Sequence, residues 1–130
     1  MSRFFAVLTA LSLSLATFAA PADARAPAVA ATAEPASFQS SRILVETRGQ
    51  GPDVVLIPGL ASTSAVWSRT ADALQNRYRV HLISVRGFGQ IPAGGNAEGR
   101  ISGPAAAEIL RYIDEESLTR PALIGHSMGG

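Results

Sequence analysis

Four short apolar runs, separated by turn residues, mark the folded part of this sequence. They cover residues 42–48, 53–57, 78–85 and 121–125, and each predicts a β-strand. The run at 53–57 is apolar without alternation, which is typical of a parallel strand with both faces covered. Folded sequence is therefore expected to begin near Ser41.

Two segments between these runs have helical spacing instead. Hydroxyl side chains at 62–64 can cap a helix, which is expected to end near Asn76. Pro104 is well placed in the first turn of a second helix. The apolar face of this second helix is predicted to be Ala106, Ile109, Leu110 and Ile113.

The resulting order is strand, strand, helix, strand, helix, strand. This alternation predicts an α/β fold with a mostly parallel sheet and helices on both faces. Functional sites in such sheets lie beyond the carboxyl ends of the strands, where Gly59, Arg86 and Ser127 fall. We expect Arg86 to hydrogen-bond loop carbonyls in a structural role.

The first 40 residues have a different pattern. Arg3, an apolar run at 4–16 and the small residues Ala22-Asp23-Ala24 predict a signal peptide over 1–24. The run is shorter than the roughly 20 residues of a membrane span, so we expect cleavage, export to the periplasm or the extracellular space, and no stable membrane span afterwards. An uncleaved anchor or a buried helix is the alternative. Residues 25–40 are rich in Ala and Pro and predict a linker before the domain at 41–130.

Composition and short motifs argue against several classes of function. The net charge is +1, and the eleven basic residues are all Arg and lie scattered, so no nucleic-acid partner is predicted. The sequence has no Cys, which excludes disulfides and a cysteine nucleophile. Gly87-Phe88-Gly89 lacks the third glycine and the following helix of a dinucleotide fingerprint. We predict no cofactor and no metal site.

The residues with the clearest chemistry stand at the end of the last strand, in the pattern Gly125-x-Ser127-x-Gly129. A turn that exposes a nucleophile between a strand and a helix is too tight for bulky neighbours, so Gly125 and Gly129 are expected to be required sterically. Ser127 is expected to have a strained backbone. An idle serine in a glycine-rich turn is the alternative.

With these motifs in place, residues 42–130 resemble the N-terminal half of an α/β-hydrolase of the esterase, lipase and perhydrolase type. The resemblance rests on 56–60 (Leu-Ile-Pro-Gly-Leu), 86–89 (Arg-Gly-Phe-Gly) and 123–130, which contains the Gly-x-Ser-x-Gly pattern. It implies that Ser127 attacks an acyl carbonyl after a His takes its proton. It also implies that the backbone N–H groups of Leu60 and Met128 form the oxyanion hole.

Three positions depart from the pattern of the family. Pro58 stands where many members have His, and Ser84 and Ile91 replace Asp and Ser around the Arg-Gly loop. Gly59 is kept, so we expect the oxyanion loop to keep its shape. The departures leave the subfamily open among esterase, lipase, perhydrolase and carbon–carbon hydrolase.

Other candidate residues lie around the predicted nucleophile. Val66 and Trp67 follow the oxyanion loop and are expected either to pack in the core or to line an acyl pocket. His126 is adjacent to Ser127 and is expected to pack beside the elbow, because the family places its catalytic His after the last strand. His81 lies within a strand and is expected to be structural.

In the family the triad acid and His follow the nucleophile, so the resemblance implies that both lie beyond Gly130 and that the C-terminal half of the fold is missing. Two hypotheses follow. One is a fragment of an exported serine hydrolase that acts on a small ester or other acyl substrate when whole. The other is a non-catalytic truncated product with at most a binding role. The oligomeric state stays open.

Overall fold

The computed structural model describes residues 38–130. The predicted signal peptide and residues 25–37 of the predicted linker lie outside the described residues. Within the described part of the chain, no helix is long and apolar enough to cross a membrane.

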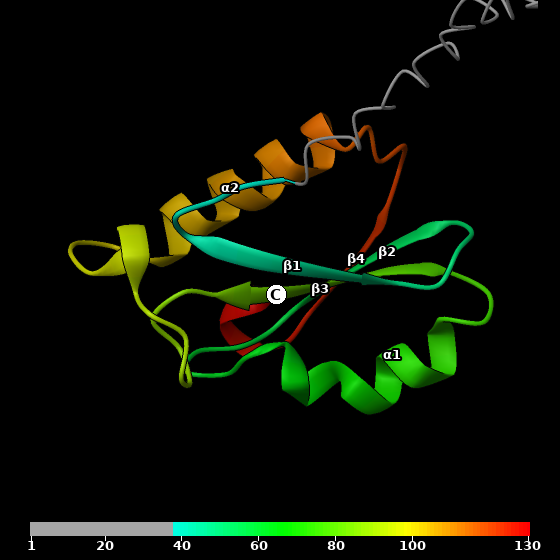
Figure 1. The fold of residues 1–130 in the computed structure, drawn as a ribbon, viewed down its shortest axis with the longest axis horizontal. Coiled ribbons are helices and arrows are strands. Elements are labelled where there is room, and N and C mark those ends of the chain that lie inside the picture. Colours follow the sequence, from blue (N-terminus) through cyan, green and yellow to red (C-terminus); the bar gives the residue numbers. More distant parts are fainter. Residues whose placement is uncertain (1–37) are drawn as a thin grey trace, which may run out of the picture. The chain divides into compact units, whose positions relative to one another are not determined.

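The centre of the domain is a four-stranded sheet with the order β1-β3-β2-β4 (Figure 1). Its strands are β1 (Ile43–Arg48), β2 (Asp53–Ile57), β3 (Arg79–Val85) and β4 (Ala122–Gly125). β2 pairs in parallel with both β3 and β4, whereas β1 is antiparallel to β3. The mostly parallel sheet predicted from the sequence is therefore confirmed, and β2 has exactly the predicted range because its apolar run ends at Pro58.

Helices cover both faces of this sheet, as predicted, with α1 (Ser68–Leu74) on one side and α2 (Ser102–Glu115) on the other (Figure 1). α1 is preceded by a 3₁₀ turn, η1 (Ser64–Trp67), which the side chain of Thr63 caps by accepting a hydrogen bond from the Ala65 N–H. The hydroxyl of Ser84, on β3, accepts a 2.9 Å hydrogen bond from the Ser64 N–H. This bond fixes the start of η1 against the sheet. Two further 3₁₀ turns are η2 (Gly94–Asn96) and η3 (Ser127–Gly129).

The apolar face of α2 differs from the sequence prediction. The buried positions are Ala105, Ile109 and Tyr112, whereas Leu110 is 63% exposed and Ala106 is also exposed. The helix is rotated because the ring of Tyr112 packs against Phe38, with centroids 4.9 Å apart, and its hydroxyl bonds to the sheet. The prediction was right for Ile109 and wrong for Leu110 and Ala106.

A buried polar network lies at the amino end of the parallel strands. His81 is 2% exposed; its Nε2 lies 2.9 Å from Asp53 Oδ1 and its Nδ1 lies 2.7 Å from the Tyr112 hydroxyl. Arg79 Nε donates to the same Asp53 oxygen at 2.5 Å. These contacts join β2, β3 and α2, so the structural role expected for His81 is confirmed.

The segment before β1 is held against α2. Arg111 donates to the Gln39 carbonyl at 2.8 Å and lies over the Phe38 ring at 4.4 Å. Ser40 donates its hydroxyl to Glu108, and the Ser40 carbonyl accepts a 3.2 Å hydrogen bond from Arg86 Nε. Arg86 thus has the structural role that the sequence predicted, on a loop carbonyl at the carboxyl end of β3.

Candidate active site

The candidate nucleophile stands directly after β4, where the chain reverses. His126 is extended, and its N–H donates to the Ile57 carbonyl at 3.2 Å, which ties the end of β4 to the end of β2. Ser127 then takes a φ of 55°, in the left-handed region that side chains disfavour. The expected strained backbone is present at Ser127.

The two flanking glycines leave no room for a side chain. A Cβ at Gly125 would overlap the backbone of Gly129. A Cβ at Gly129 would lie 2.6 Å from the Ile57 carbonyl oxygen and 2.7 Å from that of Pro58. The glycines therefore let the turn fold back onto the end of β2, which brings Ser127 beside the loop that follows β2.

That loop is a tight turn in contact with the Ser127 region. Pro58 and Gly59 are buried, and the Ser62 N–H closes the turn by donating to the Gly59 carbonyl at 3.2 Å. A Cβ at Gly59 would come within 3.1 Å of Ser127 Cβ and 3.0 Å of His126 Nδ1. Leu60, the predicted oxyanion donor of this loop, follows directly and has a side chain 65% exposed.

The second predicted oxyanion donor is Met128, the residue after Ser127. It is partly buried and packs against the core cluster on the α2 side of the sheet. It also lines a cavity of about 160 Å³ between α2 and the end of β2, together with Ile57 and Ala105. Met128 and Leu60 thus belong to two segments that meet at Ser127.

The predicted acyl-pocket residues line a cavity of about 230 Å³ together with His126. Val66 is 55% exposed, whereas Trp67 is partly buried and packs against the cluster on the α1 side of the sheet. Among residues 38–130, the buried indole N–H of Trp67 has no hydrogen-bond partner. Trp67 therefore has both expected roles, because one part of its side chain packs in the core and another part lines the cavity.

His126 lies beside the elbow, as predicted, but it is exposed and contributes to a cavity wall instead of a packed interior. Val66 and Trp67 were predicted as possible lining residues, whereas the contribution of His126 was not predicted, because it depends on the sheet bringing η1 and the end of β4 together. His81, the other histidine of the described chain, lies at the opposite end of the strands and is bonded to Asp53 and Tyr112.

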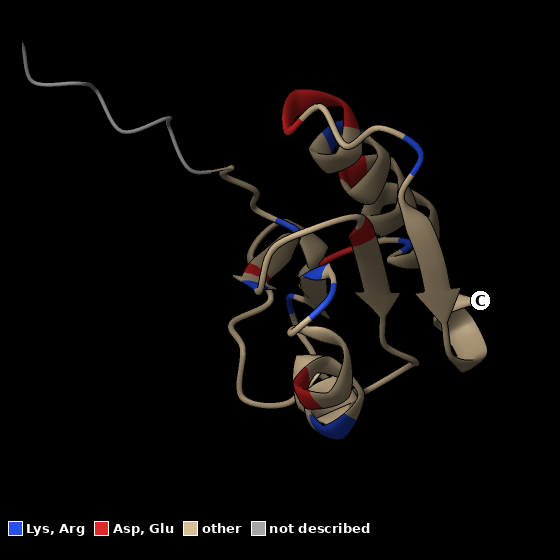
Figure 2. Cartoon of the chain, turned by 90° about the vertical axis from the view of Figure 1, so that its right-hand side faces the viewer, with Lys and Arg blue, Asp and Glu red and all other residues tan. Residues whose placement is uncertain are grey.

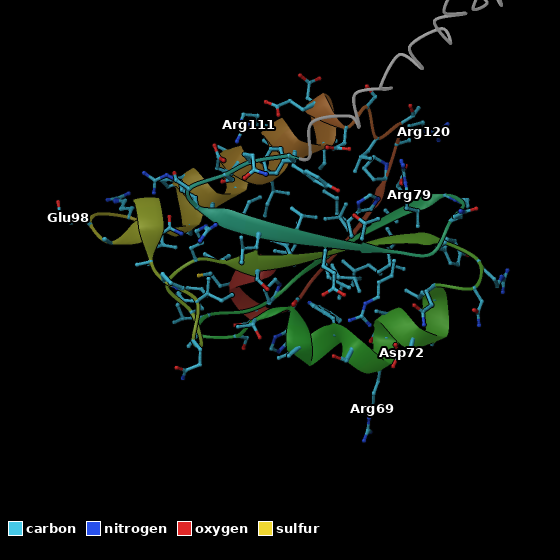
Figure 3. All side chains as sticks on the ribbon, in the orientation of Figure 1. Arg69, Asp72, Arg79, Glu98, Arg111 and Arg120 are labelled. Atoms are coloured by element: carbon cyan, nitrogen blue, oxygen red, sulfur yellow. The ribbon has the colours of Figure 1, made fainter. Side chains whose placement is uncertain are left out.

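The electrostatic surroundings of the candidate nucleophile are nearly neutral. The stretch 121–130 has no Asp, Glu, Lys or Arg, and β4 and the adjoining turn are free of charge colouring (Figure 2). Arg79, in contrast, lies at the amino end of β3, and Arg69 and Asp72 belong to α1 (Figure 3). Among residues 38–130, no hydrogen bond joins the Ser127 hydroxyl to a histidine or a carboxylate.

Comparison with known proteins agrees with this geometry. Residues 52–130 match the family model described as alpha/beta hydrolase fold. The chain is 43% identical over 88 residues to a pimeloyl-[acyl-carrier protein] methyl ester esterase of Aeromonas hydrophila, covering 68% of this chain and 33% of that protein. A protein of the same name in Aliivibrio fischeri is 32% identical over 85 residues, covering 65% and 30%. The chain belongs to the α/β-hydrolase family.

Solved structures resemble about two thirds of the chain. An alpha/beta hydrolase fold protein from Burkholderia ambifaria aligns with a TM-score of 0.60 and 31% identity, covering 68% of this chain and 32% of that one. A marine microorganism esterase aligns with a TM-score of 0.58 and 25% identity, covering 69% and 34%. The chain spans about a third of the length of the relatives that it matches.

Proposed function

We propose that this chain carries the nucleophile and the oxyanion hole of a serine esterase, with Ser127 as the nucleophile. The observation that supports this most is the backbone of Ser127, held at a φ of 55° between two glycines that cannot take a side chain. Strain of this kind persists only where the surrounding structure enforces it, and it gathers at functional sites. The relatives named as esterases favour ester hydrolysis over other chemistries of the fold.

The proposed reaction is acyl transfer through Ser127. As its Oγ bonds to the acyl carbon, a base takes the hydroxyl proton and the carbonyl electron pair moves onto oxygen. The N–H groups of Leu60 and Met128 then donate to that oxyanion. Collapse breaks the bond to the alcohol, which leaves with the proton from the base. Water releases the acid by the same two steps and restores Ser127.

The base is proposed to come from the rest of a longer protein. Within residues 38–130, His81 is buried at the far end of the sheet and His126 has no hydrogen bond to the Ser127 hydroxyl. The matched relatives are about three times as long as the matched segment. The chain as given is therefore proposed to have no Ser127-dependent activity by itself.

The proposed substrate is a small ester with an aliphatic acyl group. The cavity of about 230 Å³ beside the elbow is lined by Val66, Trp67 and His126, and among the described residues no Asp, Glu, Lys or Arg lines it. Relatives are named for a methyl ester of pimeloyl-[acyl-carrier protein], which is an aliphatic acyl compound. We also propose that the protein is exported, since the sequence of residues 1–24 has the features of a signal peptide.

The test uses the product of the complete reading frame, purified and assayed with p-nitrophenyl acetate and butyrate. We expect hydrolysis that falls at least about a thousandfold in Ser127→Ala, because removal of a triad nucleophile leaves only residual catalysis. Ser117→Ala, an exposed serine at the end of α2, is the matched control and should keep full activity. Equal turnover by Ser127→Ala and wild type would overturn the proposal.

The second candidate, a non-catalytic product, is favoured because among residues 38–130 no histidine or carboxylate is hydrogen-bonded to the Ser127 hydroxyl. Reading the gene past Gly130 separates the two candidates. An in-frame extension that encodes a carboxylate and a later histidine supports the esterase, whereas an immediate stop codon together with an inactive product supports the second candidate.

A further inference from the structure

The turn after β2 has a non-glycine residue where turns of its type take glycine. The Ser62 N–H to Gly59 carbonyl bond makes Gly59 the first residue of a four-residue turn and Ala61 the third. Ala61 has a φ of 58°, and Leu60 is not among the residues with positive φ. This combination defines a type II turn, whose third position normally holds Gly or Asn.

Nothing in the packing of Ala61 itself explains this conformation. Ala61 is exposed, so its methyl group fills no core position. The neighbouring groups fix the turn instead: the Ser62 hydroxyl donates to the Leu60 carbonyl at 3.4 Å, and Gly59 lies against Ser127 and His126. The left-handed backbone is therefore imposed at a point two residues from the closest approach of the loop to Ser127.

The turn leaves the N–H group of Leu60 unused. In a four-residue turn the fourth residue donates and the first accepts, so the N–H of the second residue is available to another acceptor. The Leu60 N–H donates to no other backbone carbonyl among the described residues. A free donor on a rigid turn next to a serine is what a developing oxyanion needs.

We propose that Ala61 is a positioning residue of the oxyanion hole, whose left-handed conformation holds the Leu60 N–H toward the acyl oxygen of a substrate on Ser127. This inference rests on the proposed function and extends it to a residue that never touches the substrate. Ala61 and Ser127 then form a pair of strained residues, with φ values of 58° and 55°, on the two segments that meet at the site. Leu60 is the donor, and Ala61 acts only through it.

The test varies how readily residue 61 takes a positive φ, in the product of the complete reading frame. Gly and Asn enter the left-handed region readily, whereas Leu and especially β-branched Val resist it. We expect Ala61→Gly and Ala61→Asn to keep kcat within about threefold. Ala61→Val is expected to lower kcat about a hundredfold with little change in KM, the loss typical of one oxyanion donor.

Asn and Leu are of similar size, so their comparison separates conformation from volume. If Ala61→Val does not fold, kcat of Ala61→Leu should still fall at least about tenfold below that of Ala61→Asn. Ser117 provides the control for strain alone, since it has a φ of 53° but follows α2, away from Ser127. Ser117→Val should lower the melting temperature as Ala61→Val does and leave kcat unchanged.

The outcomes test the positioning role of Ala61 separately from the proposed esterase function. Turnover that does not depend on Ser127 overturns the proposed function, and the positioning role falls with it. Turnover that depends on Ser127, with Ala61→Leu equal to Ala61→Asn in kcat, overturns the positioning role alone. A parallel loss of kcat in Ser117→Val and Ala61→Val would also overturn it, because the effect would then follow stability.

Discussion

The two ends of the parallel strands differ in burial and in polarity. At the amino end, Asp53, His81 and Tyr112 are linked by hydrogen bonds of 2.9 and 2.7 Å in the interior. At the carboxyl end, Ala61 and Ser127 have left-handed backbones and are exposed. Ser117 and Arg120, between α2 and β4, are also left-handed, with φ values of 53° and 54°, so strained backbone is present at both ends. The amino end has in addition a buried polar network that stabilises the fold, whereas at the carboxyl end the strained residues belong to two segments that meet.

The charge distribution follows the same division. Arg79 lies at the amino end, where its hydrogen bond to Asp53 lowers the pKa of that carboxyl group below its ordinary 3.8. Burial raises the pKa of Tyr112 above its ordinary 10.0, so the phenol stays protonated and can donate to His81 at neutral pH. The stretch 121–130 has no Asp, Glu, Lys or Arg. A neutral, partly apolar surface of this kind suits an uncharged ester.

The largest effect on stability is expected when a methyl group is added to Gly125, at the carboxyl end of β4. Gly125→Ala places a Cβ in the backbone of Gly129, which cannot move without displacing the end of β2. We expect a loss of about 3 kcal/mol or more in the free energy of unfolding, at the upper end for overpacking. Urea denaturation followed by the fluorescence of Trp67, the single tryptophan, measures it.

Gly103→Ala is the matched control for that change. Gly103 lies in the first turn of α2 and has nothing within 4 Å of an added Cβ. The same substitution there should change the free energy of unfolding by less than about 1 kcal/mol, because the helical preference of alanine is opposed by the contact of its Cβ with the ring of Pro104. Equal effects at positions 103 and 125 would contradict the steric role of Gly125.

A smaller effect is expected at the amino end, and it should depend on pH. Asp53→Asn removes the charge that Arg79 and His81 face, at an expected cost of about 2 kcal/mol near pH 7. The folded pKa of Asp53 is lowered, so its contribution is complete above the ordinary value of 3.8 and is lost as pH falls through the lower folded pKa. The stabilities of variant and wild type should therefore converge as the pH falls below the lowered folded pKa of Asp53.

Asp72→Asn is the control for this substitution. The Asp72 side chain is 63% exposed and pairs with Arg48 at 3.3 Å on the surface. We expect a change of less than about 0.5 kcal/mol at any pH, since exposed pairs contribute little. A gap between Asp53→Asn and wild type that stays constant down to pH 2 would contradict a role for the ionised Asp53.

Features of the fold that have a local sequence signal could be predicted, whereas features that depend on contacts between distant residues could not. The range of β2 and the turn at Ser127 could be predicted, because an unbroken apolar run and a Gly-x-Ser-x-Gly spacing are local signals. The rotation of α2 could not, because it depends on the contact of Tyr112 with His81, 31 residues away. Leu110 was therefore placed on the wrong face.

At the site too, the features that the sequence does not predict depend on contacts between distant parts of the chain. Ala61 carries no mark of a left-handed residue in the sequence, because the residues that indicate such a position are Gly and Asn. Its φ follows from Gly59 lying against Ser127, a contact across 68 positions of the chain. The cavity shared by Trp67 and His126 depends likewise on η1 meeting the end of β4. Such features need the assembled sheet.

The smallest effect tests the strain at the nucleophile directly. Ser127→Ala removes the hydroxyl and keeps a side chain at a φ of 55°, whereas Ser127→Gly removes both the hydroxyl and the strained Cβ. Glycine takes this conformation without steric cost, so the glycine variant should be more stable than the alanine variant by about 1 kcal/mol. Both should be equally inactive in the complete protein. Glycine gains flexibility in the unfolded chain, which limits the difference. A glycine variant that is less stable than the alanine variant by about 1 kcal/mol, the usual cost of glycine at an unstrained position, would mean that Ser127 stores no strain.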